Sequence, residues 1–367
     1  MEEEKQIPKT LCDIIVPTFN KIDHTQRFVK SFLAQTQTPS RVIFIDNGSG
    51  DGTREFLSTL RDTGEHKFII ILNNDNKGYG PAMNQGLAVS DAPYVCFCNN
   101  DVVFTRGWLD EVIWAFKENP DVGLLNPNSN NLNRMPQKGE SIDELSERLK
   151  RTFAKGSFVD MPFCIGFCMV ARRALIERIG GFSPEFAPMF FEDSDYSRRV
   201  YKAGFRLGVA KRAYVWHALH GSSDQLGKGQ EVLFKKSRDA YLKKWGRSLR
   251  LAWVVDSHEE LLEALERAVL LGREGHFISM WVKGAAPERE KIFKEANVHE
   301  ISDVKFFPFN KKWSVFWKAL TKKKKYHLVI AKDKSLGRFL KMFGQASCER
   351  FDPALIQELK FKGLEKA

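Results

Sequence analysis

The first hundred residues alternate between short apolar segments and helical patterns, and this alternation limits the possible folds more than any other feature. Strands are predicted at Asp13–Val16, Arg41–Asp46, Lys67–Leu72 and Tyr94–Cys98. Helices are predicted between them, at His24–Ala34, Gly52–Leu60 and Gly80–Val89. Short β-branched segments separated by helices are typical of βαβ units, which build a mostly parallel sheet. The sequence therefore predicts an α/β fold with a helix-flanked, mostly parallel, Rossmann-like sheet.

Polar clusters follow three of the predicted strands. They read PTFN at Pro17–Asn20, DNGS at Asp46–Ser49 and NND at Asn99–Asp101. The carboxyl ends of parallel strands meet at one edge of a sheet, and ligands bind beyond that edge, so we expect these clusters to lie together. The sequence therefore predicts one binding site rather than three unrelated loops.

The stretch DNGSGDGT, residues 46–53, joins a strand end to a helix through several glycines. Asp51 or Thr53 is suited to cap that helix, whose free N–H groups favour anions nearby. Asp46 could accept hydrogen bonds from a ribose hydroxyl or a base N–H, whereas an ordinary turn would explain the same residues. Residues 74–86, NDNKGYGPAMNQG, match neither a P-loop nor the usual dinucleotide-binding fingerprint.

A single carboxylate, Asp101, ends the third polar cluster. The cluster has the form of a D-x-D motif whose first Asp is replaced by Asn99. A hard cation such as Mg²⁺ needs only one or two protein carboxylates when substrate phosphates supply its other oxygens. Asp101 is therefore a candidate metal ligand, and a solvated Asx turn is the alternative.

Two later segments add candidate catalytic groups. In FFEDSDY, residues 190–196, Glu192 and Asp193 would lie at the start of a helix, where the dipole favours ionised carboxylates. One of them could act as a general base, although helix N-terminal chemistry alone also explains them. His217 and His220 follow a predicted strand and are either ligands or structural residues.

The chain changes character from about Leu251. Further strands with helices between them are predicted in LAWVVDS, HFISMWVKG, VKFFPFN and YHLVIAKD. We therefore predict one domain over residues 1–250, and a smaller accessory α/β domain of unassigned role over residues 251–367. Residues 305–341 contain twelve Lys or Arg and one acid, Asp333. This basic stretch is either a solvated helix end with its loop, or a docking face for anionic lipid or a phosphorylated acceptor.

An Asn-rich loop is predicted over about Asn126–Gly139.

The remaining features of the sequence concern the cellular compartment of the protein. No apolar run reaches the ~18–20 residues that span a bilayer, and MEEEKQIPKT is unlike a signal peptide, so we expect a cytoplasmic protein with reduced cysteines. A zinc site is conceivable, but the spacing is not C-x-x-C and buried core thiols are the simpler prediction. The ligands of such a zinc site would be Cys96, Cys98, Cys164 and Cys168.

Taken in order, these motifs resemble those of the family 2 inverting glycosyltransferases, nucleotide-sugar enzymes with the GT-A fold. The segments are VPTFN, IDNGSGDGT, NKGYGPAMNQG, CNNDV, GGF, FFEDSDYSRRVYKAGF and VWHALHGSS, between Cys12 and Ser223. Each is weak alone, but all of them occur in the family's order. Asn99 at the first D-x-D position is similar to bacterial members that look like rhamnosyltransferases.

The resemblance implies roles for individual residues. Asp193 would be the catalytic base with Glu192 beside it, and Asp101 and His217 would hold Mg²⁺ or Mn²⁺. Asp46 would contact the base or ribose of the donor. The residues implied in donor binding are Pro17, Thr18, Asn20, Asp46, Asn47, Gly48, Asn76, Gly78, Asn84, Asn99 and Asn100.

The implied reaction is a metal-assisted single displacement with inversion. It would move a sugar from a UDP-, dTDP- or GDP-linked donor to a hydroxyl of a glycan, glycolipid or protein acceptor. One alternative is a non-catalytic nucleotide-sugar-binding relative, against which the presence of Asp46, Asp101 and Asp193 counts. Another is a nucleic-acid-binding protein, suggested by the basic charge of residues 305–341. No zinc-finger, helix-turn-helix or RRM signature accompanies that charge, so no nucleic-acid partner is expected.

Overall fold

The computed structural model describes residues 10–218, 228–321, 325–342, 346–362 and 364. The chain divides into two compact units, residues 1–158 with 163–238 and residues 159–162 with 239–367. The functional boundary that the sequence suggests at residue 250 stays a prediction. Among the described residues, no helix combines the length and the apolar character that a bilayer crossing requires.

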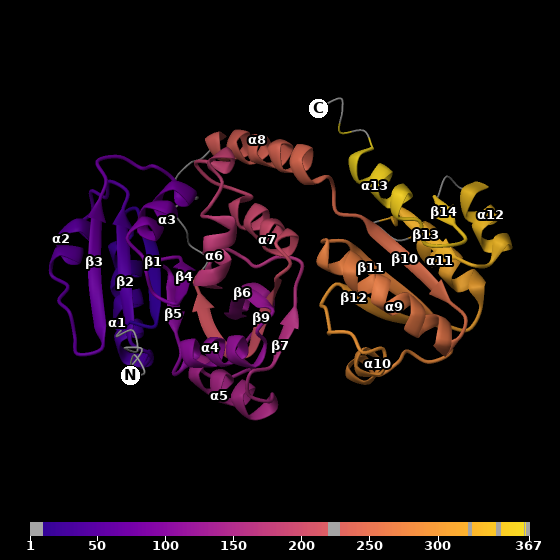
Figure 1. Ribbon diagram of the computed structural model, residues 1–367, viewed down its shortest axis with the longest axis horizontal. Helices are drawn as coiled ribbons and strands as arrows, with labels where there is room; N and C mark the ends of the chain where they lie inside the picture. Colours follow the sequence, from indigo (N-terminus) through magenta and orange to yellow (C-terminus); the bar gives the residue numbers. More distant parts are fainter. Residues whose placement is uncertain (1–9, 219–227, 322–324, 343–345, 363, 365–367) are drawn as a thin grey trace, which may run out of the picture. The chain divides into compact units, whose positions relative to one another are not determined.

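The first unit is built on a mixed sheet with the strand order β3-β2-β1-β4-β8-β6-β9-β5 (Figure 1). Its strands are β1 (Cys12–Thr18), β2 (Ser40–Asp46), β3 (His66–Leu72), β4 (Tyr94–Cys98), β5 (Val102–Phe104), β6 (Val122–Asn128), β8 (Cys168–Arg172) and β9 (Arg206–His217). The short strand β7 (Phe158–Asp160) lies off this path. The predicted strands and helices of the first hundred residues are confirmed, with small shifts of their ends.

Helices cover both faces of this sheet. They are α1 (Ile22–Gln35), α2 (Thr53–Ser58), α3 (Tyr79–Ala88), α4 (Trp108–Glu118), α5 (Ile142–Thr152), α6 (Arg173–Ile179) and α7 (Glu192–Lys202), and α8 (Lys228–Trp245) follows. Along β1, Ile14 packs in a core with α1 and α4, whereas Ile15 packs in a second core with α3, α6 and α7. Alternate residues of a strand point to opposite faces, so a strand covered on both sides must be continuously apolar.

The half of this sheet after β4 differs from a simple parallel arrangement. β1, β2, β3 and β4 pair in parallel, but β8 is antiparallel to both β4 and β6, and β5 is antiparallel to β9. The predicted Asn-rich loop is partly wrong, because Asn126 and Asn128 belong to β6 and are buried. Their amides donate to backbone carbonyls, which allows asparagine in a buried strand.

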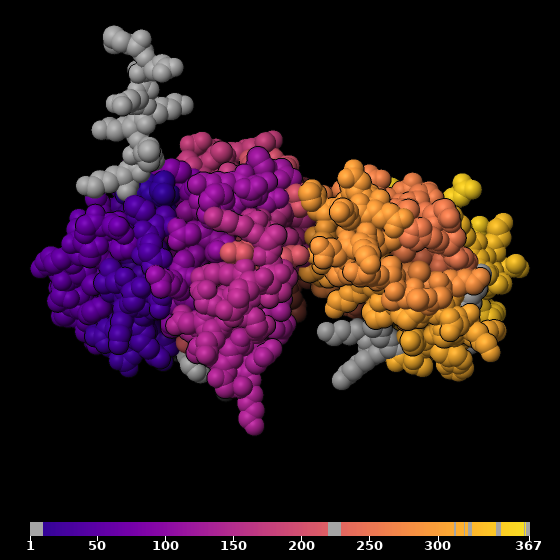
Figure 2. Space-filling view, turned by 90° about the horizontal axis from the view of Figure 1, so that it is seen from below, coloured from indigo at the N-terminus to yellow at the C-terminus, as the bar shows by residue number. Residues whose placement is uncertain are grey.

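The second unit contains a parallel sheet with the strand order β12-β11-β10-β13-β14. Its strands are β10 (Arg250–Val255), β11 (Phe277–Lys283), β12 (Val304–Phe309), β13 (Leu328–Ala331) and β14 (Ser347–Cys348). Its helices are α9 (His258–Arg273), α10 (Arg289–Glu295), α11 (Lys312–Thr321), α12 (Lys334–Met342) and α13 (Pro353–Phe361). Helices α9, α10 and α13 share one core with the sheet, and α11 and α12 share another. The outer surface of this unit is orange to yellow in Figure 2. The predicted α/β class is confirmed for both units.

Candidate functional site

A cavity of about 610 Å³ lies where β1 and β4 end, at the edge to which the sequence assigns the polar clusters. The neighbouring loops are tied together there, because the Asn47 N–H donates to the Thr18 carbonyl at 2.8 Å. The predicted site residues that line the cavity are Pro17, Thr18, Asn47, Asn76, Gly78, Asn99, Asn100, Asp101, Glu192, Asp193 and His217. The structure therefore brings together most of the predicted site.

Asp101 and His217 meet because β5 and β9 pair antiparallel, with Val102 opposite His217. His217 Nε2 lies 3.0 Å from Asp101 Oδ1, and both residues are buried. The position of His217 is held by Asn130, whose side chain accepts from the His217 N–H and donates to its carbonyl. The ring of Phe167 stacks on the imidazole. His220, the other predicted histidine, lies outside the described residues.

The contacts of the His217 ring depend on which of its nitrogens carries the proton. Asn99 Nδ2, which can only donate, lies 3.3 Å from His217 Nε2, and Nε2 accepts this bond in the tautomer whose proton is on Nδ1. In the other tautomer Nε2 carries the proton and faces Asp101 Oδ1 at 3.0 Å. Within the described part of the chain, neither Asp101 oxygen accepts a hydrogen bond.

This arrangement fits a divalent cation. A buried carboxylate without a donor is costly, and a positive charge between the oxygen and the ring nitrogen would remove that cost. Carboxylate and neutral imidazole are both accepted ligands of Mn²⁺, and Mg²⁺ also accepts one or two carboxylates when phosphates complete its coordination. Asp101 and His217 are the residues that would hold the ion.

The acids of the second motif begin helix α7 as expected. Asp193 Oδ2 accepts from the Gly166 N–H at 3.0 Å, and Asp193 Oδ1 accepts from the Ser194 N–H at 2.6 Å. Glu192 differs, because its buried Oε2 has no hydrogen-bond partner among the described residues. Both acids lie in the first turn of α7, which favours their charged forms, but Asp193 also accepts hydrogen bonds from the Gly166 and Ser194 N–H groups.

Burial raises the pKa of both acids. The pKa of Glu192 rises to about 8, first because the side chain is desolvated and second because the Asp193 charge lies nearby. The pKa of Asp193 is raised by desolvation, and its hydrogen bonds to Gly166 and Ser194 lower it. At neutral pH Glu192 therefore holds a proton, and Asp193 is the better candidate for a carboxylate that accepts one.

The backbone that leads into α7 is strained. Phe190 and Phe191 both adopt positive φ, at 76° and 67°, a region that bulky residues rarely occupy. Such strain costs about 1–3 kcal/mol per residue and gathers at functional sites. The segment packs closely on Gly78, where a Cβ would lie 2.4 Å from the Pro188 carbonyl oxygen. Gly78, predicted as a donor-binding residue, is thus required by this close backbone approach.

Asp46 lies outside the cavity wall in a saturated hydrogen-bond network. Its Oδ2 accepts from the N–H groups of Gly48 and Ser49 and from Arg54 Nε at 2.7 Å. Its Oδ1 accepts from Thr18 Oγ1 at 3.3 Å. In this structure Asp46 shapes the loop that borders the cavity, and its predicted contact with the donor stays a prediction.

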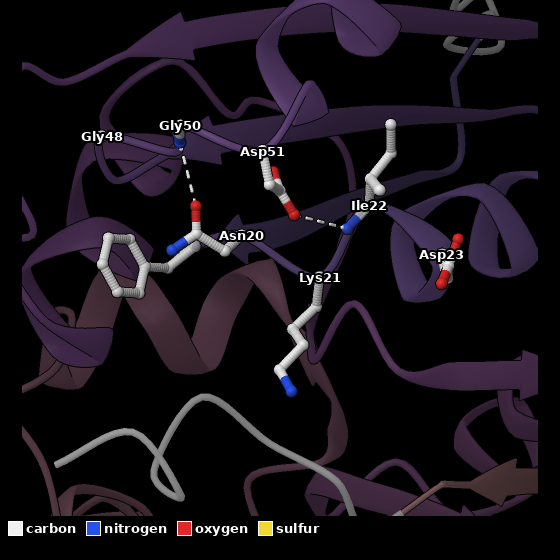
Figure 3. Close-up of a pocket in the computed structure, with 8 residues that line it drawn as sticks. Asn20, Lys21, Ile22, Asp23, Gly48, Gly50 and Asp51 are labelled. Carbon is white, nitrogen blue, oxygen red and sulfur yellow. Dashed lines mark hydrogen bonds between the residues drawn. The ribbon is translucent and has the colours of Figure 1, made fainter.

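Asn20 and Gly48 line a separate hollow between the loops that follow β1 and β2 (Figure 3). Asn20 Oδ1 accepts from the Gly50 N–H at 2.9 Å, and Asp51 Oδ2 accepts from the Ile22 N–H at 3.0 Å. These bonds fasten the two loops to each other. Gly48 has φ +84°, and a Cβ there would lie 3.0 Å from the Asn74 carbonyl oxygen.

The amides predicted to support the donor make different contacts. Asn76 Oδ1 accepts from the Gly78 N–H, and Asn100 Nδ2 donates to Thr25 Oγ1. Asn84 does not line the cavity, because both ends of its amide are bonded to the backbone of Phe182. Its role as a donor-binding residue stays a prediction.

The buried cysteines lie in the core beneath this site. The sulfurs of Cys96, Cys98 and Cys168 are within 4.8 Å of one another on β4 and β8. Cys164 is separate, with its thiol directed at the carbonyls of Leu124 and Gly208. Burial raises the pKa of these thiols, so they are neutral at physiological pH. The four cysteines therefore do not converge on one centre.

Some residues at and around the cavity were missed by the sequence reasoning. Asn130, behind the cavity wall, and Phe167, which lines it, position His217, but they stand far from it in the sequence and carry no local signal. Tyr79 and Gly166 line the cavity and are joined by a bond from the Tyr79 hydroxyl to the Gly166 carbonyl. Tyr79 stands between the glycines of KGYGP, and this was the available sequence signal.

Comparison with known proteins relates the first unit to a known family. Residues 13–180, slightly less than half of the chain, match the model of glycosyl transferase family 2. Over these residues the chain is similar to that family. Together with the observed strand order, this match confirms the predicted GT-A fold. A second α/β unit follows it in the sequence.

Proteins similar to this part of the chain include two bacterial rhamnosyltransferases. The O-antigen chain rhamnosyltransferase WbaN of Salmonella anatum is 25% identical over 217 residues, which cover 56% of this chain and 65% of that protein. The N-acetylglucosaminyl-diphospho-decaprenol L-rhamnosyltransferase of Mycobacterium tuberculosis is 25% identical over 240 residues, 56% of this chain and 75% of that one. This chain thus spans slightly less than two thirds of WbaN.

Among solved structures, the domain is similar to the mannosyltransferase PcManGT of Pyrobaculum calidifontis in complex with GDP-Man and Mn²⁺. The two are 17% identical with a TM-score of 0.47, over 71% of this chain and 69% of that one.

Proposed function

We propose that the first unit is an inverting glycosyltransferase that moves a sugar from a nucleoside-diphosphate sugar to a hydroxyl acceptor. The observation that carries this proposal is the composition of one cavity wall. It contains an acid held by hydrogen bonds, Asp193, and a buried carboxylate–imidazole pair without a donor, Asp101 and His217. Base catalysis and binding of a metal diphosphate need these two groups in the same site.

Asp193 is proposed as the general base. It takes the proton of the acceptor hydroxyl while that oxygen forms a bond to the anomeric carbon. The bond from this carbon to the diphosphate oxygen breaks on the opposite face, and the diphosphate leaves with the electron pair, so the configuration inverts. Glu192, protonated at neutral pH, remains available as a hydrogen-bond donor to a substrate oxygen.

Asp101 and His217 are proposed to hold Mg²⁺ or Mn²⁺. When bound, the cation would neutralise negative charge on the diphosphate leaving group. The Asn99 amide borders the same position, because its Nδ2 lies 3.3 Å from His217 Nε2. The loop of Asn47, Asn76 and Gly78 supplies amide groups beside this position for the nucleotide.

The donor is proposed to be UDP-, dTDP- or GDP-linked, with a deoxyhexose such as rhamnose tested first because two relatives bear that name. The acceptor would be a glycan, a glycolipid or a protein. A screen that measures nucleotide release from each donor, with Mn²⁺, Mg²⁺ or EDTA, tests the proposal. Metal-dependent release from one donor supports it, whereas metal-dependent nucleotide binding without any turnover would indicate the non-catalytic alternative.

The variant Asp193→Asn tests the base. We expect transfer to fall at least about 100-fold, because general base catalysis contributes roughly 10²–10⁴-fold. Donor affinity should stay nearly unchanged in the same variant. Asp143→Asn, an exposed acid in the first turn of α5, is the matched control. Full activity in Asp193→Asn would move the role to Glu192, since Asp195 is buried and paired with Arg199 at 2.9 Å.

A further inference from the structure

The outer surface of α11 and α12 in the second unit is unusually apolar for a solvent-exposed helix pair. Trp313 and Trp317 lie one turn apart on α11 and are 57% and 60% exposed, and Met342 at the end of α12 is 70% exposed. Tryptophan is a large apolar side chain that folded proteins usually cover. These three residues and the cations around them are called the Trp–Lys surface below.

The exposure of the two tryptophans does not come from a helix without a core. Val315 and Phe316 of α11 and Leu336 and Leu340 of α12 are buried against the second sheet. Trp313 packs edge-on against Phe316 and Phe339, with ring centroids 5.6 and 4.9 Å apart. The helices are therefore anchored from beneath, and the tryptophans are held at the outer surface.

The cations of the Trp–Lys surface are largely free of counter-ions. Lys311, Lys318, Arg338 and Lys341 are exposed, and none of them forms an ion pair in the described part of the chain. Neither α11 nor α12 contains an acid. The opposite face is different, because α9 alone carries four glutamates in HEELLEALERAVLLGR. The second unit is thus charged asymmetrically across its sheet.

We propose that the Trp–Lys surface docks on an anionic lipid bilayer. Tryptophan rings favour the interface between headgroups and acyl chains, and neighbouring Lys or Arg side chains bind the lipid phosphates. Each basic residue near an anionic membrane adds a modest attraction, so the surface would bind reversibly. A nucleic acid would also match the charge, but it would gain little from burying Met342. This proposal is independent of the sugar that the first unit transfers.

Vesicle co-sedimentation of the full chain tests this docking. We expect binding to vesicles of phosphatidylglycerol with phosphatidylcholine and none to phosphatidylcholine alone. Raising NaCl from about 0.1 to about 0.5 M should weaken the binding, because salt screens the attraction. Equal binding to neutral vesicles, or no binding to either kind, would overturn the proposal.

Variants locate the docking surface. Trp313→Ala with Trp317→Ala should lower vesicle affinity at least about tenfold. Because Trp313 also packs against Phe339, a second variant, Arg338→Glu with Lys341→Glu, changes only exposed ends and should give a similar loss. Leu270→Ala, an exposed apolar residue of α9 on the other face, is the control. An equal loss in the control, retained binding in Arg338→Glu with Lys341→Glu, or displacement of the vesicles by duplex DNA would overturn the assignment.

Discussion

Two buried aspartates at one edge of the first sheet differ in the hydrogen bonds that their carboxylates accept. Asp46 is the last residue of β2 and receives hydrogen bonds from Gly48, Ser49, Arg54 and Thr18. Asp101 follows β4, and among the described residues neither of its oxygens accepts a hydrogen bond, although His217 Nε2 lies 3.0 Å from Oδ1. Both sit at the position where an α/β sheet binds ligands.

The difference separates a carboxylate that maintains structure from one prepared for a ligand. The charge of Asp46 is neutralised within the protein, so the folded state is stable without a substrate. The charge of Asp101 faces the His217 ring, and a bound cation would compensate it. A protein keeps such an arrangement at the expense of its stability when the group is needed for function.

The largest expected effect is on Asp46. Asp46→Asn would leave Arg54 and two backbone N–H groups facing an amide, so we expect a loss of about 2–3 kcal/mol in the free energy of unfolding. Urea denaturation followed by circular dichroism measures it. Asp91→Asn is the control, because Asp91 pairs with Arg41 at the exposed surface and such pairs contribute less than about 1 kcal/mol. Equal losses in the two variants would contradict a special role for the Asp46 network.

Asp101→Asn should act in the opposite direction. Removing an uncompensated buried charge is expected to raise the stability of the metal-free protein by about 1 kcal/mol. Mn²⁺ with a nucleoside diphosphate should raise the melting temperature of the wild-type chain and leave that of Asp101→Asn nearly unchanged. The measurement is a thermal shift in EDTA and in Mn²⁺. If Asp101→Asn destabilised the chain as Asp46→Asn does, the comparison would fail.

The sequence could not distinguish these two aspartates, although it located both. The parallel strands β1 to β4 follow from apolar segments and turn residues, which are local signals. Part of the Asp46 network is local too, because Gly48 and Ser49 belong to the same turn. The environment of Asp101 depends on β9, and the parallel interpretation did not anticipate that β5 and β9 pair antiparallel. Contacts between distant segments leave no periodic pattern in a single sequence.

Glu192 extends the comparison to a third buried carboxylate. Like Asp101 it has an oxygen without a donor, but it is neutralised by a proton rather than by a cation. Its pKa rises from an ordinary 4.5 to about 8 because of burial and of the Asp193 charge. The folded state therefore binds more protons than the unfolded chain between these pH values, and stability must fall as pH rises through that range.

Glu192→Gln should remove this part of the pH dependence. The penalty of ionising Glu192 is absent below about pH 4.5 and complete above about pH 8, so the variant should gain stability relative to wild type as pH rises. Denaturation curves of both proteins at about pH 5, 6.5 and 8 measure the difference in their free energies of unfolding. Parallel stability profiles would mean that Glu192 titrates normally.

The last expected effect concerns Asn99, which stands where the first acid of a D-x-D motif would be. Asn99→Asp would place another carboxylate beside His217, whose Nε2 lies 3.3 Å from the present amide. We expect Mn²⁺ to bind about tenfold more tightly without donor, because affinity rises with the charge of the ligands. Isothermal titration calorimetry measures this affinity.

The neighbouring residue provides the control for that experiment. Asn100→Asp adds the same charge one position along, but the Asn100 side chain is bonded to Thr25. Its carboxylate should therefore leave Mn²⁺ affinity nearly unchanged. A tenfold gain in both variants would show that general negative charge attracts the ion. A gain in Asn99→Asp alone would show that geometry at Asp101 and His217 determines the binding, with Asn99 limiting how tightly the cation is held before the donor arrives.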